Sequence, residues 1–139
     1  MSFLLDTNVV SETTKPRPNS GVVRWLEAAD EDKTFLSVVT IAEIRYGIDR
    51  MPVGGRRNRI EEWFQADLPS RFEGKILPIN PRVADACGRL WAHSEAIGKS
   101  ISPMDALIAA TAEVHGLTLV TRNTARFAHA LQSILNPWI

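Results

Sequence analysis

The sequence predicts an α/β fold in three layers, in which helices cover both faces of a central, mostly parallel sheet of four to five strands. Short, continuously apolar segments alternate with longer segments whose apolar residues recur every three or four positions. Continuous apolar character is typical of strands that are covered on both faces, and the recurring spacing is typical of amphipathic helices. Strands that alternate with helices favour a parallel sheet, because each parallel pair needs a crossover connection.

Length and composition limit the class of protein. A chain of 139 residues without repeats or long linkers is close to the ~150 residues of a typical domain, so one domain spanning residues 1–139 is predicted. The 45% hydrophobic and 23% charged residues exclude a disordered chain. The apolar runs are far below the ~20 residues of a membrane helix, and the N-terminus lacks the features of a secretory signal. Cys87 is the one cysteine and permits no internal disulfide, which suits a cytoplasmic protein without membrane contact.

Five apolar segments are the predicted strands. They span residues Phe3–Leu5, Thr34–Ser37, Lys75–Ile79, Leu117–Thr121 and, as a possible fifth strand, Ile134–Leu135. In a parallel sheet with helices on both faces, ligands bind at the carboxyl ends of the strands. Polar residues that directly follow these segments are therefore the candidates for a functional site.

Five amphipathic stripes are the predicted helices. They run from Val22 to Ala29, Ile41 to Met51, Ile60 to Leu68, Val83 to Ser94 and Met104 to Val114. Trp63 and Trp91 fall on these stripes and are expected in the core.

Three acidic residues lie where such a site is expected, and each has a structural alternative. Asp6 directly follows the first strand, where it could cap the next turn. Glu43 follows the second strand in a Thr40-x-x-Glu43 tetrad, and Asp105 starts a helix in a Ser102-x-x-Asp105 tetrad. Both tetrads match the capping box, in which hydroxyl and acid satisfy the backbone at a helix start. Taken singly, each acid favours the capping interpretation.

The combination of the three acids favours a metal site. Carboxylates that converge on one pocket repel one another unless a cation neutralises them. A hard cation such as Mg²⁺ prefers oxygen ligands of this kind, and it can activate a water molecule for phosphoryl displacement. Capping does not exclude ligation, because a carboxylate can order the backbone with one oxygen and face the pocket with the other.

Four segments resemble the motifs of PIN-domain ribonucleases, in particular the VapC-type toxins of bacterial toxin–antitoxin pairs. They are Leu4–Glu12, Ser37–Gly47, Ser102–Ala112 and Leu117–Asn123, and Leu135–Trp138 is similar to a common ending in one branch of the family. The segments follow the family order and extend over residues 3 to 138.

The resemblance implies a PIN-like fold and a Mg²⁺-dependent endoribonuclease, with Mn²⁺ as a substitute. By the resemblance, Asp6, Glu43 and Asp105 are the catalytic residues and metal ligands, and a metal-activated water hydrolyses RNA. The family's usual partner is a small antitoxin protein whose C-terminal segment covers the site, and its toxins are commonly homodimers.

One position departs from the family pattern. The family often has an aspartate three residues after the asparagine of the fourth motif, and this chain has Arg126 there. If Asn123 caps the last helix, Arg126 lies in its first turn, where a cation opposes the helix dipole by up to ~1 kcal/mol. We therefore expect an anionic partner for Arg126, either the acidic cluster without metal or an RNA phosphate. The alternative is a solvated surface arginine. Loss of a carboxylate also disfavours a tightly held second metal ion.

Four further residues are candidate supporting or substrate-contacting residues. Thr7 and Thr121 are placed to orient the carboxylates by hydrogen bonds, or are ordinary hydroxyls at strand ends. Asn8 and Asn123 are placed to hold the loops around the site.

Net charge adds a constraint on RNA binding. The 16 basic residues are balanced by 16 acidic residues, which excludes binding by bulk positive charge. With three acids assigned to a metal site, 16 positive charges face 13 negative charges elsewhere. RNA binding is therefore expected to depend on the metal and on specific contacts.

Other enzyme functions of α/β proteins need acidic residues that this sequence lacks. An aspartyl phosphatase needs a second acid where Asn8 stands, and a receiver domain needs an acid after the third strand. A structure-specific DNA nuclease on this scaffold would carry more acids. An inactive or weakly active PIN-like module that binds a partner remains an alternative, because Arg126 replaces an acid.

Overall fold

The computed structural model describes residues 1–139, and its five strands form one parallel sheet. The strand order is β3-β2-β1-β4-β5, which confirms the predicted α/β fold. The strands are β1 (Phe3–Leu5), β2 (Thr34–Ser37), β3 (Ile76–Leu77), β4 (Thr118–Val120) and β5 (Ile134–Leu135).

Two strands are shorter than predicted, for identifiable reasons. β3 ends before Pro78, which has no N–H to continue the ladder. β4 begins one residue late, because the Leu117 N–H is bonded to the Ala112 carbonyl at the end of the preceding helix. That bond closes a turn in which Gly116 has a φ of 64°, a left-handed conformation that favours glycine.

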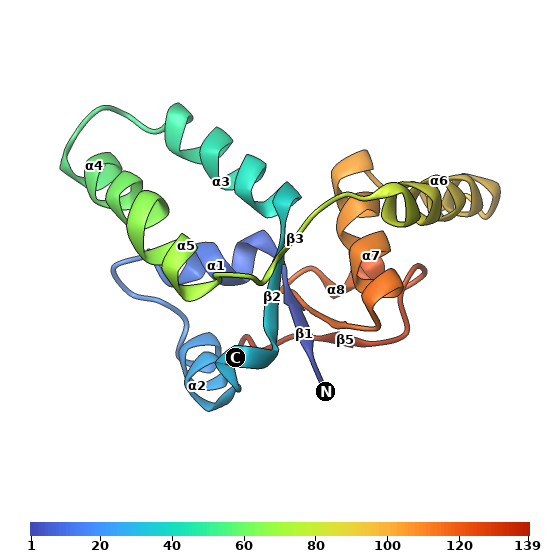
Figure 1. Ribbon diagram of the computed structural model, residues 1–139, viewed down its shortest axis with the longest axis horizontal. Helices are drawn as coiled ribbons and strands as arrows, with labels where there is room; N and C mark the ends of the chain where they lie inside the picture. The colour runs from blue at the N-terminus through green and yellow to red at the C-terminus, as the bar shows by residue number, and fades with distance from the viewer.

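Helices connect the strands and cover both faces of the sheet (Figure 1). They are α1 (Thr7–Glu12), α2 (Ser20–Ala28), α3 (Val38–Arg50), α4 (Gly55–Glu62), α5 (Leu68–Arg71), α6 (Pro81–Ala96), α7 (Pro103–His115) and α8 (Thr124–Phe127). A short 3₁₀ turn (Glu31–Lys33) precedes β2, and a π-helical turn (Trp63–Asp67) joins α4 to α5. None of these helices has the length and apolar character to span a membrane.

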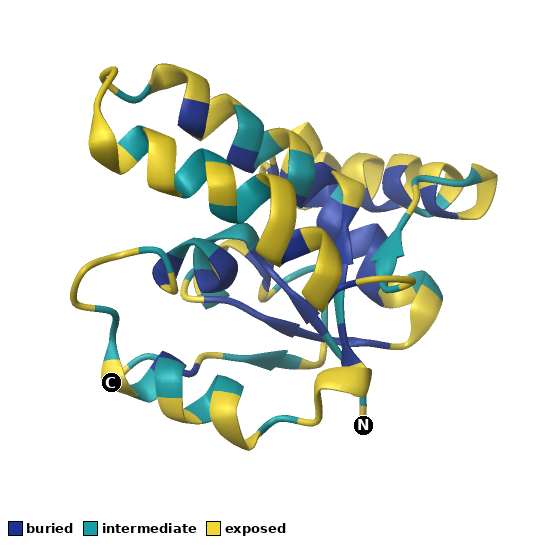
Figure 2. Ribbon diagram, turned by 60° about the vertical axis from the view of Figure 1, so that its left-hand side comes forward, coloured by how far each residue is buried: buried dark blue, intermediate teal, exposed yellow.

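Alternate residues of the central strands enter two separate cores. Leu4 and Leu119 are fully buried on one face, against α6, α7 and α8. Leu5 and Val120 are buried on the other face, against helices α1 to α5. Figure 2 shows the buried strands between helices whose outer faces are exposed. Both faces are thus covered, as the continuous apolar character of the strands predicts.

The two tryptophans that are expected in the core, Trp63 and Trp91, differ in burial. Trp63 is partly buried and packs against the core that contains Leu5. Trp91 is 42% exposed, so its expected place in the core is wrong. It lies next to Leu90, which holds the buried position at this point of α6.

The strand order explains where a site can form. β1 lies between β2 and β4, so the carboxyl ends of these three strands meet at one edge of the sheet. The Asp6 N–H continues the ladder to the Val120 carbonyl at 2.9 Å, so Asp6 lies at that edge. Residues far apart in the chain are brought together there.

Candidate active site

Asp6 lies at the carboxyl end of β1 and is only 6% exposed. It caps α1, because its Oδ1 accepts a hydrogen bond of 2.8 Å from the Thr7 N–H. Its Oδ2 accepts a 2.8 Å bond from the Thr121 hydroxyl, which follows β4. The capping interpretation is therefore confirmed for one oxygen, while the other is held by a neighbouring strand.

Glu43 lies in α3, and the predicted capping box around it is wrong. The helix begins at Val38, where the Ser37 hydroxyl accepts from the Val39 N–H at 3.0 Å. The Thr40-x-x-Glu43 tetrad therefore lies inside the helix rather than at its start. The Glu43 Oε1 instead accepts a short 2.6 Å bond from the Thr7 hydroxyl.

Asp105 lies in the first turn of α7 and is 7% exposed. The Ser102 hydroxyl caps this helix by accepting from the Asp105 N–H at 3.2 Å. The Asp105 carboxylate accepts two bonds from Arg126 on the single oxygen Oδ2, from Nε at 3.1 Å and from Nη2 at 2.5 Å. The serine half of the predicted capping box is confirmed, and the acid is bound to a side chain instead of the helix start.

Three of the candidate supporting residues, Asn8, Thr121 and Asn123, lie around Asp6. The Thr121 Oγ1 that donates to Asp6 also accepts from the Asn123 N–H at 3.1 Å. The Asn8 amide lies 3.4 Å from both Asp6 Oδ2 and Thr121 Oγ1, and its carbonyl accepts from the Arg122 N–H. These contacts join the loop after β1 to the loop after β4.

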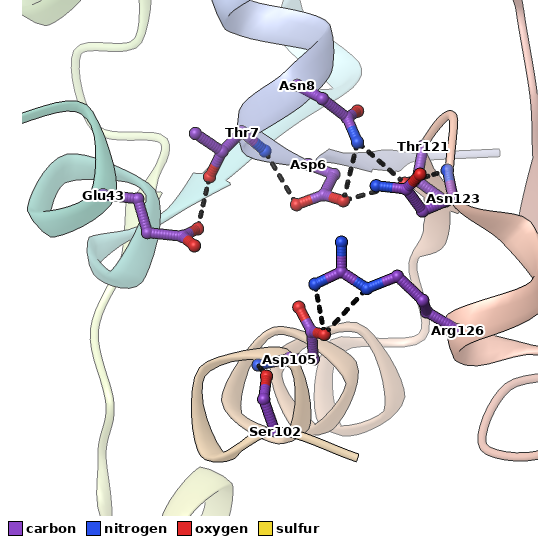
Figure 3. Close-up of polar contacts among 9 residues, drawn as sticks. All are labelled: Asp6, Thr7, Asn8, Glu43, Ser102, Asp105, Thr121, Asn123 and Arg126. Atoms are coloured by element: carbon purple, nitrogen blue, oxygen red, sulfur yellow. Dashed lines mark hydrogen bonds and ion pairs between the residues drawn. The ribbon is translucent and has the colours of Figure 1, made fainter. Parts of the chain in front are cut away.

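Asn123 is the N-cap residue of α8 by position, but its side chain makes no capping hydrogen bond. α8 has only one turn, so Arg126 lies near its end as well as its start, and its guanidinium points toward Asp105 and Asp6 (Figure 3). The expected anionic partner of Arg126 is therefore Asp105. The interpretation of Arg126 as a solvated surface residue without a partner is wrong.

Burial and mutual repulsion perturb two of the acids. Burial raises the pKa of Asp6, hydrogen bonds from Thr121 and Thr7 oppose the rise, and the nearby Asp105 adds to it. Burial also raises the pKa of Glu43 against the Thr7 hydrogen bond, and the charges of Asp6 and Asp105 raise it further. The positive charge of Arg126 lowers both pKa values. Burial is thus the main cause of both shifts, and repulsion among the carboxylates adds to it.

Two structural contacts near the site were not predicted from the sequence. The Thr40 hydroxyl lies 3.1 Å from the Thr7 hydroxyl and is fully buried. Glu12 is 5% exposed and accepts from the Asn19 N–H at 2.8 Å while pairing with Lys15 at 2.9 Å. Lys15 lies beyond the end of α1 at Glu12, so no helical spacing in the sequence indicates this pair.

The donor set fits a divalent cation, although the side chains are not arranged around one. Asp6, Glu43 and Asp105 come from three different elements, and their carboxylates face the same space (Figure 3). As they stand, no three acidic, histidine or cysteine side chains form a group that could hold a metal ion. The Arg126 guanidinium lies between Asp105 and Asp6, where it supplies positive charge. Carboxylate oxygens are the ligands that Mg²⁺ prefers, and in this arrangement Arg126 occupies one of them, Asp105 Oδ2.

Comparison with known proteins identifies the family. The PIN domain family matches residues 3–130. The chain belongs to the PIN domain family. Toxin FitB of Neisseria gonorrhoeae is 38% identical to this PIN domain over 136 residues, which are 98% of each chain. VapC ribonuclease Y4jK of Sinorhizobium fredii is 36% identical to this chain, and the match covers 98% of this chain and 97% of the relative.

More distant relatives and solved structures agree with this assignment. A tRNA(fMet)-specific endonuclease VapC of Shigella flexneri is 32% identical over 91% of this PIN domain and 90% of its own length. The crystal structure of FitAcB from Neisseria gonorrhoeae includes a chain with a TM-score of 0.92 and 38% identity over 98% of both chains. A DNA-bound VapBC from Salmonella typhimurium includes one with a TM-score of 0.82 and 25% identity over 98% of both chains. The relatives therefore match nearly the whole chain.

Proposed function

We propose that this PIN domain is a Mg²⁺-dependent endoribonuclease, with Mn²⁺ as a substitute, and the toxin of a toxin–antitoxin pair. The observation that carries the proposal is the convergence of Asp6, Glu43 and Asp105 from three elements at the carboxyl edge of the sheet. Relatives named ribonuclease or endonuclease cover more than nine-tenths of the chain and support the reaction class. The substrate is RNA, and the reaction is hydrolysis of a phosphodiester bond.

The site residues have two roles in the proposed reaction, holding the metal and orienting its ligands. Asp6, Glu43 and Asp105 are the groups that would hold the metal, which would supply an activated water and stabilise negative charge on the phosphate. Thr121 holds Asp6 by donating to Oδ2, and Thr7 holds Glu43 by donating to Oε1. These hydroxyls limit the rotation of the carboxylates, so less ordering is needed when a cation binds.

The proposed partners are a small antitoxin protein and a second copy of this chain. Solved relatives are toxin–antitoxin complexes, among them FitAcB and VapBC. Tyr46 is 63% exposed and Val38 is 37% exposed on α3, which is apolar surface that an interface could cover. Light scattering of the purified protein, alone and with the product of a neighbouring short reading frame, measures both assemblies.

The reaction is tested by incubating the protein with structured RNAs and Mg²⁺. We expect cleavage that is lost with a chelator and in Asp6→Asn and Asp105→Asn. Asp85→Asn is the matched control, because Asp85 is an exposed acid on α6 that pairs with Arg89 outside the site. Cleavage that persists in both site variants would overturn the proposal and indicate a contaminating nuclease.

A second candidate is an inactive PIN-like module that binds a partner. The Arg126–Asp105 ion pair favours it, because it engages an acid that the reaction needs. Antitoxin binding by a protein that cleaves no RNA and binds no Mn²⁺ would support this candidate.

A further inference from the structure

Arg126 is bound to the acidic cluster by a contact that can open without disturbing the core. Its Nε and Nη2 both donate to Asp105 Oδ2. The Arg126 side chain is 54% exposed, whereas the Asp105 side chain is 9% exposed. The guanidinium therefore has solvent beside it, while the carboxylate stays in the site.

The neighbouring residue holds the backbone of Arg126 in place. Phe127 follows it in α8 and is fully buried in the core with Leu119. Arg126 thus projects from an anchored helical turn, and a change of its side-chain rotamers moves the guanidinium while the helix stays packed.

α8 is a single turn, Thr124–Phe127, and Arg126 is a basic residue near its end, so the helix dipole does not oppose a cation there. The two bonds to Asp105 Oδ2 are the hydrogen bonds that hold the guanidinium. The carboxylates thus supply the interaction that keeps the guanidinium there. Its charge also acts on Asp6 and Glu43, whose pKa values it lowers.

We propose that Arg126 is a displaceable internal cation that neutralises the carboxylates in the metal-free protein and must leave Asp105 before a divalent ion binds. This inference rests on the proposed function, because it assumes that Asp105 is a metal ligand. Arg126 then sets the metal affinity, since every binding event includes the loss of its two bonds to Asp105. The same contact keeps the metal-free protein stable by opposing repulsion among the acids.

Titration of Mn²⁺ by calorimetry, without RNA, tests the inference directly. Arg126→Gln removes the charge and keeps most of the side chain, and we expect it to bind Mn²⁺ about tenfold more tightly than the parent. A charge-assisted hydrogen bond accounts for a difference of this size. Arg89→Gln is the matched control, because it removes another arginine whose Nε lies 3.1 Å from an aspartate outside the site. We expect parental affinity for this control.

A second measurement separates competition from general destabilisation. Without metal, Arg126→Gln should melt at a lower temperature than the parent, because the acids lose their counter-ion. With saturating Mn²⁺, the difference should shrink or reverse. Circular dichroism verifies that the variant is folded, as its exposed side chain predicts.

The outcomes distinguish this inference from the proposed function. If Asp6→Asn abolishes Mn²⁺ binding and Arg126→Gln binds like the parent or more weakly, the displacement model is overturned while the metal site stands. If neither the parent nor Arg126→Gln binds Mn²⁺, the proposed metal-dependent function is overturned, and the inference falls with it.

Discussion

Replacing Thr7 by valine removes one hydroxyl, keeps the shape of the side chain and tests how Glu43 is positioned. The Thr7 hydroxyl donates to Glu43 Oε1 at 2.6 Å, a short bond to a charged acceptor. Hydrogen bonds to charged groups contribute ~1.5–3 kcal/mol to stability. Glu43 is exposed enough for water to replace part of the contact. We therefore expect Thr7→Val to lower the free energy of unfolding of the metal-free protein by about 1.5 kcal/mol.

The same substitution changes the ionisation of Glu43. Burial raises the pKa of Glu43, and the Thr7 hydrogen bond lowers it. Without that bond the pKa rises further, so a higher pH is needed before the ionised carboxylate is available to a cation. We expect the Mn²⁺ affinity of Thr7→Val to reach its plateau at a higher pH than that of the parent.

Urea unfolding and calorimetry at a series of pH values measure the two effects. Thr7→Ser is the control, because it keeps the hydroxyl and should behave like the parent. In a Glu43→Gln background the cost of Thr7→Val should shrink, since the acceptor is then neutral. Equal behaviour of the valine and serine variants, or the same cost in both backgrounds, would refute a positioning role for Thr7.

Three further predictions concern charge, metal and backbone. The pKa values of Asp6 and Glu43 are higher in the folded protein than in the unfolded chain. The stabilisation from these two acids is therefore complete below their unfolded-state pKa values, near pH ~4. It is lost as the pH rises through their folded-state pKa values. Urea unfolding of the metal-free protein across pH should therefore show a weaker loss above pH ~4 in the Asp6→Asn/Glu43→Gln double variant; an unchanged slope would contradict this. Mn²⁺ at a concentration of a hundred times its Kd should raise the free energy of unfolding of the parent by about 2.7 kcal/mol. The stability of Asp105→Asn should not change with Mn²⁺, and thermal melts with and without the ion measure the difference. Gly116→Ala should cost about 1 kcal/mol, because φ is 64° at this position; an unchanged urea midpoint would be inconsistent with the left-handed turn.

The strands are predictable from sequence because both faces of the sheet are covered. Phe3–Leu5 is apolar throughout and Thr34–Ser37 is polar only at its two ends, and the structure places both strands at those bounds. Strand ends depend on individual hydrogen bonds, which an apolar pattern does not contain. The Leu117 N–H illustrates this, because an apolar residue that looks like the start of a strand completes the end of a helix instead.

The location of the acids was predictable, but their contacts were not. Asp6 follows an apolar strand, and parallel topology then places it at the carboxyl edge with the residues after β2 and β4. The bond between Thr7 and Glu43 joins residues 36 positions apart, and it depends on where α3 begins. Ser37 and Thr40 both have a hydroxyl that could cap a helix. The structure shows that α3 begins at Val38, so Ser37 is the capping residue.

Arg126 changes the charge of the site in a way that bears on how many metal ions it holds. Once Arg126 has left Asp105, the three carboxylates carry three negative charges, which one divalent cation reduces to one and two would exceed. An aspartate at this position would give four negative charges, enough to balance two divalent ions. With arginine in place of an aspartate, a second ion would have one ligand fewer and would leave the site with a net positive charge. The charges therefore favour a single divalent cation, so the stoichiometry of Mn²⁺ binding should be one per chain in the parent protein.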